Sequence, residues 1–373
     1  MDAGDPLSVI TLIAQSVDES TGLGRIASAL AAEYAKCGYG VHIVSQRCES
    51  TPGIWHRVPG YAITPAAGKI AFRLFERSIT GTTGASVLHA FGVGAAADIV
   101  SAQSCHKAAV KLQKSRGRQR IVRRNFGLYD RLSLGDERRL FLGPRRKRIV
   151  AVSRLVRQQI LEEYDIPENA VSILPNGVHL ARFNRENMRQ GVGGEGGVPF
   201  TLLFVGNEFD RKGLQTVIES LPLVAEIPLE VHIAGNDDPA PYIRRAEELG
   251  VSDRLRFLGS ISSPESLFPH ADALVFPTHY EPFGMVIMEA MAAGIPVITS
   301  RMAGAVEGLT DGVHGLYLDD PLSAQELAKS VRTLVENKTL RGTLGRNGRA
   351  AAEQYAWPVI AARFLELYRS LGS

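Results

Sequence analysis

Short apolar runs alternate along this chain with longer segments in which apolar residues recur at helical spacing. In the first half, helical spacing predicts helices over residues 25–37, 70–78 and 153–163. The apolar runs between them predict buried strands at residues 7–15, 40–46, 85–92, 97–104, 147–153 and 170–177. Strands that alternate with helices form a parallel, doubly wound sheet, so this half predicts a Rossmann-like α/β domain.

The pattern stops in the glycine-rich stretch 182–200 and then resumes. The second half predicts strands at residues 201–207, 229–236, 254–260, 271–277 and 294–300. A chain of 373 residues also exceeds the size of about 250 to 300 residues at which single cores stop growing. We therefore predict two Rossmann-like domains, 1–178 and 200–355, joined by a linker over 179–199. A final amphipathic helix, 356–373, is expected to return to the first domain.

In open parallel sheets of this type, ligands bind beyond the carboxyl ends of the strands. We therefore expect the two predicted domains to face each other across a cleft that holds the functional site.

The composition is ordinary for a soluble globular protein, with 45% hydrophobic and 22% charged residues. No segment has the roughly 18 uninterrupted apolar residues of a spanning helix, and no basic lead precedes the first apolar run, so we expect a cytoplasmic protein. Cys37, Cys48 and Cys105 are odd in number and form no C-x-x-C motif. We expect them to be buried free thiols in a reducing compartment.

Positive charge is concentrated in residues 107–148, which carry fifteen Lys and Arg against three acidic residues, whereas the whole chain has a net charge of only +3. Such clusters can be plain solvated helix faces. An excess this large favours an anionic partner, and Leu140, Phe141 and Leu142 within it favour a membrane surface or phosphorylated lipid over nucleic acid. We expect a protein peripheral to the inner face of the membrane.

The stretch 273–300 predicts a strand, a loop, a helix and a second strand. Pro282 and Gly284 place Glu281 on the loop, whereas Glu289 falls within the helix. The amides of Gly284 and the two residues after it, Met285 and Val286, lie at the helix start, where backbone donors lack partners and attract anions. This arrangement suits a diphosphate.

A second glycine-bearing stretch, 20–29, follows the first predicted strand. Gly22, Gly24 and Ala27 match the G-x-G-x-x-A dinucleotide pattern, which is weak evidence alone. Arg47, at the end of the next strand, suits a 2′-phosphate, so an NADP enzyme remains an alternative, as does a purely structural turn.

Cations and histidines follow other predicted strands. Arg211 and Lys212 lie between a strand and a helix, where they can neutralise a diphosphate or simply form a solvated helix start. His89 and His106 lie beside successive strand ends of the first domain. Each can belong to a site or be a hydrogen-bonded core residue.

Together these motifs resemble the retaining family-four glycosyltransferases of the GT-B fold. The resemblance rests on Glu281-x7-Glu289, FVGNEFDRKG at 204–213, LPNGV at 174–178 and STGLGR at 20–25, in order over nearly the whole chain. The spacing in GNEFDRKG at 206–213 and the basic region after His106 are most similar to the lipopolysaccharide-core sugar transferases of that family.

The resemblance implies roles for individual residues. Glu289 would bind the nucleotide ribose and Glu281 the donor sugar, while His106 would lie beside the reacting sugar. The other donor-binding residues that it implies are Gly22, Arg211, Lys212, Phe283, Gly284, Met285 and Val286, with His89 as an outer neighbour of the site. This chain departs from the family pattern at Thr21, where many members have a second glycine, and at Asn207, where many have an arginine.

These roles imply a metal-independent, retaining hexosyltransferase without a cofactor, which moves a sugar from a nucleotide-diphosphate sugar to a hydroxyl of a glycolipid or lipopolysaccharide-type glycan. Asp237 and Asp238 are interpreted as a helix-start turn rather than as a metal site. Two alternatives remain: a nucleotide-sugar epimerase of similar fold, and a non-catalytic protein that binds nucleotide sugars.

Overall fold

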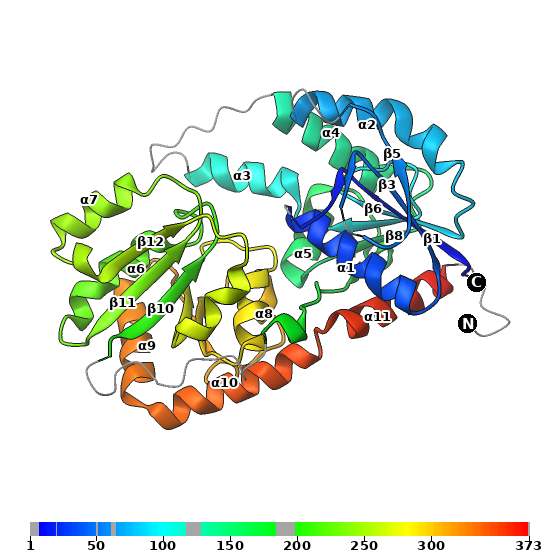
Figure 1. The fold of residues 1–373 in the computed structure, drawn as a ribbon. Coiled ribbons are helices and arrows are strands. Elements are labelled where there is room, and N and C mark those ends of the chain that lie inside the picture. The colour runs from blue at the N-terminus through cyan, green and yellow to red at the C-terminus, as the bar shows by residue number, and fades with distance from the viewer. Residues whose placement is uncertain are drawn as a thin grey trace. The chain divides into compact units, whose positions relative to one another are not determined.

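The computed structural model (Figure 1) describes residues 7–19, 21–49, 51–60, 65–116, 128–183 and 198–371. The chain divides into two compact units. Unit 1 comprises Met1–Gly177 and Trp357–Ser373, and unit 2 comprises Val178–Ala356. Each unit contains a parallel sheet flanked by helices, so the prediction of a two-domain α/β protein is confirmed.

The sheet of unit 1 has seven strands in the order β5-β3-β1-β6-β7-β8-β9, with every neighbouring pair parallel. The strands are β1 (Val9–Ala14), β3 (Gly40–Ser45), β5 (Ile54–Arg57), β6 (Val87–Phe91), β7 (Ile99–Ala102), β8 (Arg148–Ala151) and β9 (Val171–Ile173). A separate pair is formed by β2 (Ser16–Val17) and β4 (Arg47–Cys48). The exposed side chains of β5 lack the buried pattern that identified the other strands, which is why the sequence did not predict it.

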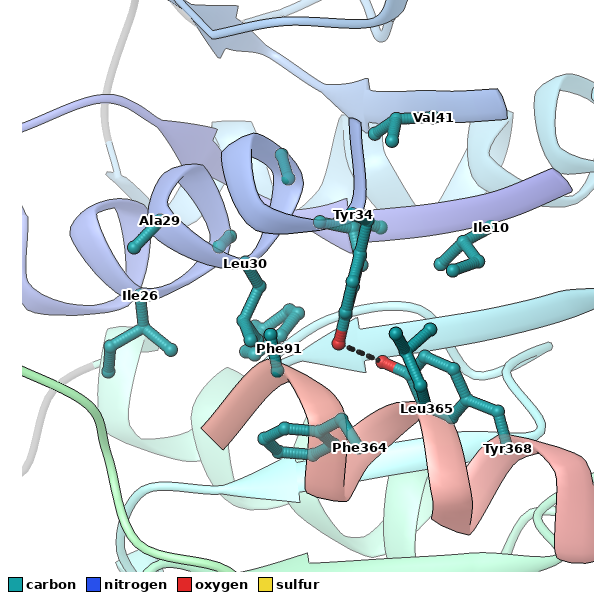
Figure 2. Close-up of a cluster of buried hydrophobic side chains, with 14 of the residues drawn as sticks. Ile10, Ile26, Ala29, Leu30, Tyr34, Val41, Phe91, Phe364, Leu365 and Tyr368 are labelled. Carbon is teal, nitrogen blue, oxygen red and sulfur yellow. Dashed lines mark hydrogen bonds between the residues drawn. The ribbon is translucent and has the colours of Figure 1, made fainter. Parts of the chain in front are cut away.

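The helices of unit 1 are α1 (Gly22–Lys36), α2 (Pro65–Thr80), α3 (His106–Arg116), α4 (Leu128–Leu142), α5 (Arg154–Glu163) and α11 (Trp357–Ser370). The C-terminal helix α11 packs into the core of this unit, where Phe364, Leu365 and Tyr368 are buried. Figure 2 shows the hydroxyls of Tyr34 and Tyr368 in contact, at 2.8 Å, within this apolar cluster.

The sheet of unit 2 has six strands in the order β12-β11-β10-β13-β14-β15. The strands are β10 (Phe200–Val205), β11 (Leu229–Ala234), β12 (Leu255–Gly259), β13 (Ala273–Phe276), β14 (Val297–Ser300) and β15 (Leu316–Leu318). The α-helices are α6 (Leu214–Ser220), α7 (Ala240–Glu248), α8 (Met285–Ala292), α9 (Ala324–Glu336) and α10 (Lys338–Glu353). Strands β10 and β13 pair at the centre of the sheet, so the loops that follow them emerge from its middle.

Several expectations need correction. Helix α1 begins at Gly22 rather than at residue 25, because the Thr21 hydroxyl accepts a hydrogen bond from Gly24 N at 2.9 Å and caps the helix. All three cysteines are free, but Cys105 is buried whereas Cys37 is exposed. Among the described residues, no helix has both the length and the apolar character needed to cross a membrane.

Candidate functional site

The loop between β13 and α8 is held by the segment that follows β14. Glu281 N donates to Met302 O at 3.0 Å, and Gly304 N donates to Glu281 O at 2.9 Å. Ala305 N donates in turn to Phe283 O at 2.7 Å. The backbone that carries Glu281 is therefore fixed by its neighbours.

Helix α8 begins without a side-chain cap. Its N-cap, Gly284, has a left-handed backbone with φ of 103°, a conformation that glycine adopts without the penalty of a Cβ. The amides of Gly284, Met285 and Val286 donate no hydrogen bond to any residue in the described part of the chain. Phe283 and Val286 are buried beside this helix start. As predicted from the sequence, an open N-terminus follows the β13 loop.

The loop between β10 and α6 is joined to the β13 loop through one carbonyl. Arg211 O accepts from His279 N at 2.9 Å and from Thr278 Oγ1 at 3.2 Å. Gly213 has a φ of 84°, and a Cβ there would lie 2.1 Å from Pro277 O. The Arg-Lys-Gly stretch therefore lies directly against the loop that carries Glu281.

Arg211 is largely committed to acidic partners. Its guanidinium lies 2.6 Å from a Glu208 oxygen and 3.1 Å from a Glu281 oxygen, and it donates to Tyr280 O at 2.5 Å. Burial lowers the pKa of Arg211, but the two carboxylates outweigh that effect and raise it. The sequence analysis assigned Arg211 and Lys212 the same role, whereas in the structure only Arg211 is paired with carboxylates.

Lys212 has a different environment. Its ammonium lies 5.2 Å from the centre of the Phe276 ring and forms no ion pair within 4.0 Å among the residues described. Burial lowers the pKa of Lys212, although Glu281 and the more weakly acting Glu289 oppose that shift. A Cβ on Gly206 would lie 2.1 Å from the Lys212 ammonium, so glycine at 206 makes room for it. This cation is partly desolvated and lacks full compensation, a setting that favours an anionic ligand.

Two residues that the sequence did not assign to the site shape its rim. Asn207 Oδ1 accepts from Asn236 N at 3.0 Å, so the residue that replaces the family arginine ties the ends of β10 and β11 together. Asp237 Oδ2 accepts from Phe209 N at 2.7 Å and braces the same loop. Only Asp238 behaves as predicted, accepting from Ala240 N at the start of α7.

In unit 1, the glycines of residues 20–29 lie in the first turn of α1. A Cβ on Gly24 would lie 2.5 Å from Asp18 O, so this glycine is required for packing, whereas a Cβ on Gly22 would meet nothing within 4 Å. Arg47 lies 3.5 Å from Asp18 and 2.6 Å from Glu49. Because acidic residues already engage Arg47, it is poorly suited to a 2′-phosphate.

His106 is the first residue of α3. Its amide donates to Glu137 Oε2, and Lys107 N donates to Glu137 Oε1 at 3.0 Å. The Tyr164 hydroxyl donates to the same carboxylate at 2.6 Å. The His106 ring is half-buried, with Nε2 3.8 Å from Asp130. No local pattern indicates this role of Glu137, which lies 31 residues further along the chain than His106.

His89 is a hydrogen-bonded core residue, one of the two alternatives that its sequence position left open. It lies within β6, fully buried, with Nδ1 2.6 Å from the Tyr368 hydroxyl and Nε2 2.8 Å from the Ser101 hydroxyl. Burial lowers the pKa of His89 to about 3, so the ring is neutral. Both ring nitrogens are engaged in holding α11 and β7.

The basic stretch 107–148 lies partly outside the described residues, since 117–127 are not among them. Within the described part, Leu140 and Phe141 are buried, and Phe141 packs edge-on against Tyr164. The expectation that these two side chains contact a membrane is therefore wrong. Of the three apolar residues named in the sequence analysis, only Leu142 is exposed. In the part of the chain that the structure describes, no group of three or more His, Cys, Asp or Glu is placed to hold a metal ion.

Two family models match the chain in sequence. One described as Glycosyltransferase Family 4 matches residues 20–182, and one described as Glycosyl transferases group 1 matches residues 186–351. Together they span most of the chain and divide it close to the boundary between the two units.

Individual relatives agree with the family models. An uncharacterized glycosyltransferase of Methanocaldococcus jannaschii is 28% identical over 233 residues, which are 59% of each chain. The lipopolysaccharide glucosyltransferase WaaG of Escherichia coli is 29% identical over 213 residues, 54% of this chain and 57% of WaaG. Each alignment thus spans less than two thirds of the relative's own length.

Solved structures match the fold over almost the whole chain. A crystal structure of WaaG, described as involved in lipopolysaccharide biosynthesis, has a TM-score of 0.76 at 20% identity and covers 96% of this chain and 99% of its own. Anabaena HepE, crystallised with UDP and glucose, has a TM-score of 0.68 at 18% identity over 97% of this chain and 100% of its own. At these identities the likeness concerns the fold.

Proposed function

We propose a function from one premise: this chain belongs to the family-four glycosyltransferases, which have the GT-B fold. The chain transfers a hexose from a nucleotide-diphosphate sugar to an acceptor hydroxyl, with retention of the anomeric configuration and without a metal or a separate cofactor. One observation carries the proposal: in unit 2, the loop that carries the partly desolvated Lys212 is hydrogen-bonded, through Arg211 O, to the loop that leads to the uncapped α8.

The charges of this site fit the donor. The open amides of Gly284, Met285 and Val286, together with Lys212, bind the diphosphate and stabilise the negative charge that grows on it as the glycosidic bond breaks. Glu289 accepts hydrogen bonds from the ribose and Glu281 from the sugar hydroxyls. Arg211 holds the Glu281 carboxylate in place and adds positive charge at the diphosphate.

The first unit supplies the remaining roles. Gly22, whose Cβ position is open, approaches the diphosphate, and His106 lies beside the reacting sugar. The departing phosphate helps to deprotonate the acceptor hydroxyl, which is consistent with retention. Incubation of the nucleotide sugar with an acceptor, followed by proton NMR of the product, gives the anomeric configuration of the new glycosidic bond. An inverted product contradicts the proposed mechanism. Activity that is lost in a chelator contradicts metal independence.

The acceptor that we propose is a glycolipid or lipopolysaccharide-type glycan presented at a membrane surface. The support is the excess of basic residues in 107–148 and the sequence similarity to WaaG. An epimerase would release a free product with no acceptor present, and a binding protein would not turn over even with acceptor supplied. Incubation of donor with and without acceptor separates these three functions.

A thermal-shift panel of nucleoside diphosphates and nucleotide sugars, beginning with UDP and UDP-glucose, tests the donor site. A ligand that binds the folded state raises Tm in proportion to its affinity and concentration. We expect Glu289→Ala to abolish the shift. Glu230→Ala is the matched control, because Glu230 is an acidic residue of β11 paired with Arg256. An unchanged shift in Glu289→Ala removes Glu289 from the ribose role.

A further inference from the structure

Helix α2 in unit 1 buries charged side chains and exposes an apolar side, although Phe72 on its buried side is also apolar, at 1% exposure. The side chains of Lys69 and Glu76 are buried, at 6% exposure each. The side chains of Ile70, Leu74 and Phe75 are instead exposed, at 45%, 72% and 43%. A surface helix ordinarily turns its apolar stripe to the core and its charges to water. An exposed apolar cluster of this kind marks a surface that contacts something other than water.

Contacts of its charged side chains fix the orientation of α2. Lys69 lies 3.1 Å from Asp136 of α4, and Arg73 lies 2.6 Å from the same carboxylate. On the next turn, Glu76 accepts a hydrogen bond from Ala95 N at 3.1 Å. Rotating α2 to bury its apolar side would break all three contacts and leave charged groups unpaired in the interior, at high cost. The fold therefore holds the apolar residues outward.

Exposed arginines lie on α2 and on the neighbouring helix α4. Arg77 is exposed on α2 itself, and Arg131 and Arg138 are exposed on α4. Figure 1 shows α2 and α4 side by side, and the two helices contact each other. A helix that combines exposed apolar side chains with neighbouring arginines has the two features that bind an anionic bilayer: apolar insertion and attraction to lipid headgroups.

We propose that the α2 face, defined by Ile70, Leu74 and Phe75, docks on an anionic lipid surface with Arg77, Arg131 and Arg138 at the headgroups. The arginines select this occupant, because an apolar partner protein does not call for a positively charged rim. The inference rests on the proposed function for its purpose, since it places the transferase where a lipid-linked acceptor is presented. It also replaces Leu140 and Phe141, which are buried, as the apolar contacts.

Sedimentation with vesicles tests the docking. We expect the wild-type chain to sediment with phosphatidylcholine vesicles that contain 30% phosphatidylglycerol, about tenfold more than with phosphatidylcholine alone. The double variant Leu74→Glu, Phe75→Glu should lose binding to both. The matched control is Leu322→Glu in unit 2, which changes a side chain with 61% exposure and should bind as the wild type does. Arg77→Glu with Arg138→Glu should lose only the preference for anionic vesicles.

A second readout separates insertion from other contacts. The tryptophan fluorescence of Phe75→Trp should shift to shorter wavelength on addition of anionic vesicles. The wild-type chain, which has two tryptophans, should show a smaller shift. No sedimentation of the wild type, or full binding by the double variant, overturns the inference. Self-association that the double variant abolishes, seen by light scattering, overturns it in favour of a second copy.

The nucleotide thermal shift serves as an independent measure in every variant. If the wild-type chain shows the nucleotide-induced Tm shift but does not bind vesicles, the docking is refuted and the proposed function stays in place. If the wild-type chain shows no nucleotide-induced Tm shift, the proposed function is refuted whatever the vesicle result.

Discussion

The N-termini of α3 and α8 follow parallel strands in their respective units, yet they are completed in opposite ways. At α3, the Glu137 carboxylate accepts from the amides of His106 and Lys107 and from the Tyr164 hydroxyl. Burial, with help from this carboxylate, raises the pKa of Tyr164. At α8, a left-handed Gly284 occupies the N-cap, and no side chain caps the helix.

We propose that this difference separates a structural helix end from a ligand-binding one. A helix N-terminus carries a partial positive charge and unpaired donors, which either a protein carboxylate or a ligand can satisfy. Glu137 accepts from the first two amides of α3 within the protein, so that end is not an open anion site. No side chain caps α8, and we propose that an anionic ligand accepts from its amides while Lys212 adds positive charge.

The largest effect is expected from removing the Glu137 carboxylate at the N-terminus of α3. Glu137→Ala leaves two amides and the Tyr164 hydroxyl without their acceptor in a buried place. Each such group costs about 1–3 kcal/mol, and we expect about 3 kcal/mol less stability of unit 1 after relaxation. Urea unfolding followed by circular dichroism measures the loss. Glu137→Gln retains an acceptor oxygen and should lose less free energy of unfolding. A loss below about 0.5 kcal/mol in Glu137→Ala would show that α3 does not need the Glu137 carboxylate.

Removing the charge of Lys212 should weaken ligand binding without destabilising the fold. Lys212→Met should lose about 2 kcal/mol of nucleoside diphosphate binding, close to 30-fold, the range for a hydrogen bond to a charged group. Its stability should stay level, because burial already disfavours the ammonium. Calorimetric titration gives the affinity, with Lys212→Arg as the charge-preserving control. Unchanged affinity in Lys212→Met would place the diphosphate elsewhere.

A Cβ at Gly284, the N-cap of α8, should strain the backbone there. Gly284→Ala requires a left-handed alanine, which costs about 1–2 kcal/mol, and its Cβ would lie 3.0 Å from Ile287 Cδ1. We expect a lower Tm and weaker donor binding. Gly22→Ala is the matched change, since its Cβ meets no atom within 4 Å and alanine favours a helix. It should leave Tm unchanged or higher; if it also leaves donor affinity unchanged, Gly22 does not approach the diphosphate.

The smallest effect is a pH dependence of binding. Burial lowers the pKa of Lys212 in the free site, and a bound diphosphate should raise it again. Affinity is then full below the lowered pKa of the free site and falls as the pH rises through it, because binding must take up a proton. Titrations in buffers of different ionisation enthalpy measure that uptake. Lys212→Arg should remove this dependence, and uptake that persists in this variant would assign the proton to another group.

Local periodicity predicted two parallel sheets and most of their strands, though not β5 or β15, because alternating apolar runs and amphipathic segments define buried strands and covering helices. It also located the β13–α8 region: Pro282 and Gly284 break the chain between Glu281 and Glu289, and such backbone preferences act within a few residues.

Only the tertiary structure decided which side of each element is covered, since that depends on partners far away in sequence. His89 and His106 looked equivalent, yet Tyr368, 279 residues distant, makes His89 a core residue. Likewise, Glu137 closes the end of α3, and Asp136 holds α2 with its apolar side outward. A sequence pattern records which residues share a face, whereas the free energy of burying that face is set by whatever packs against it.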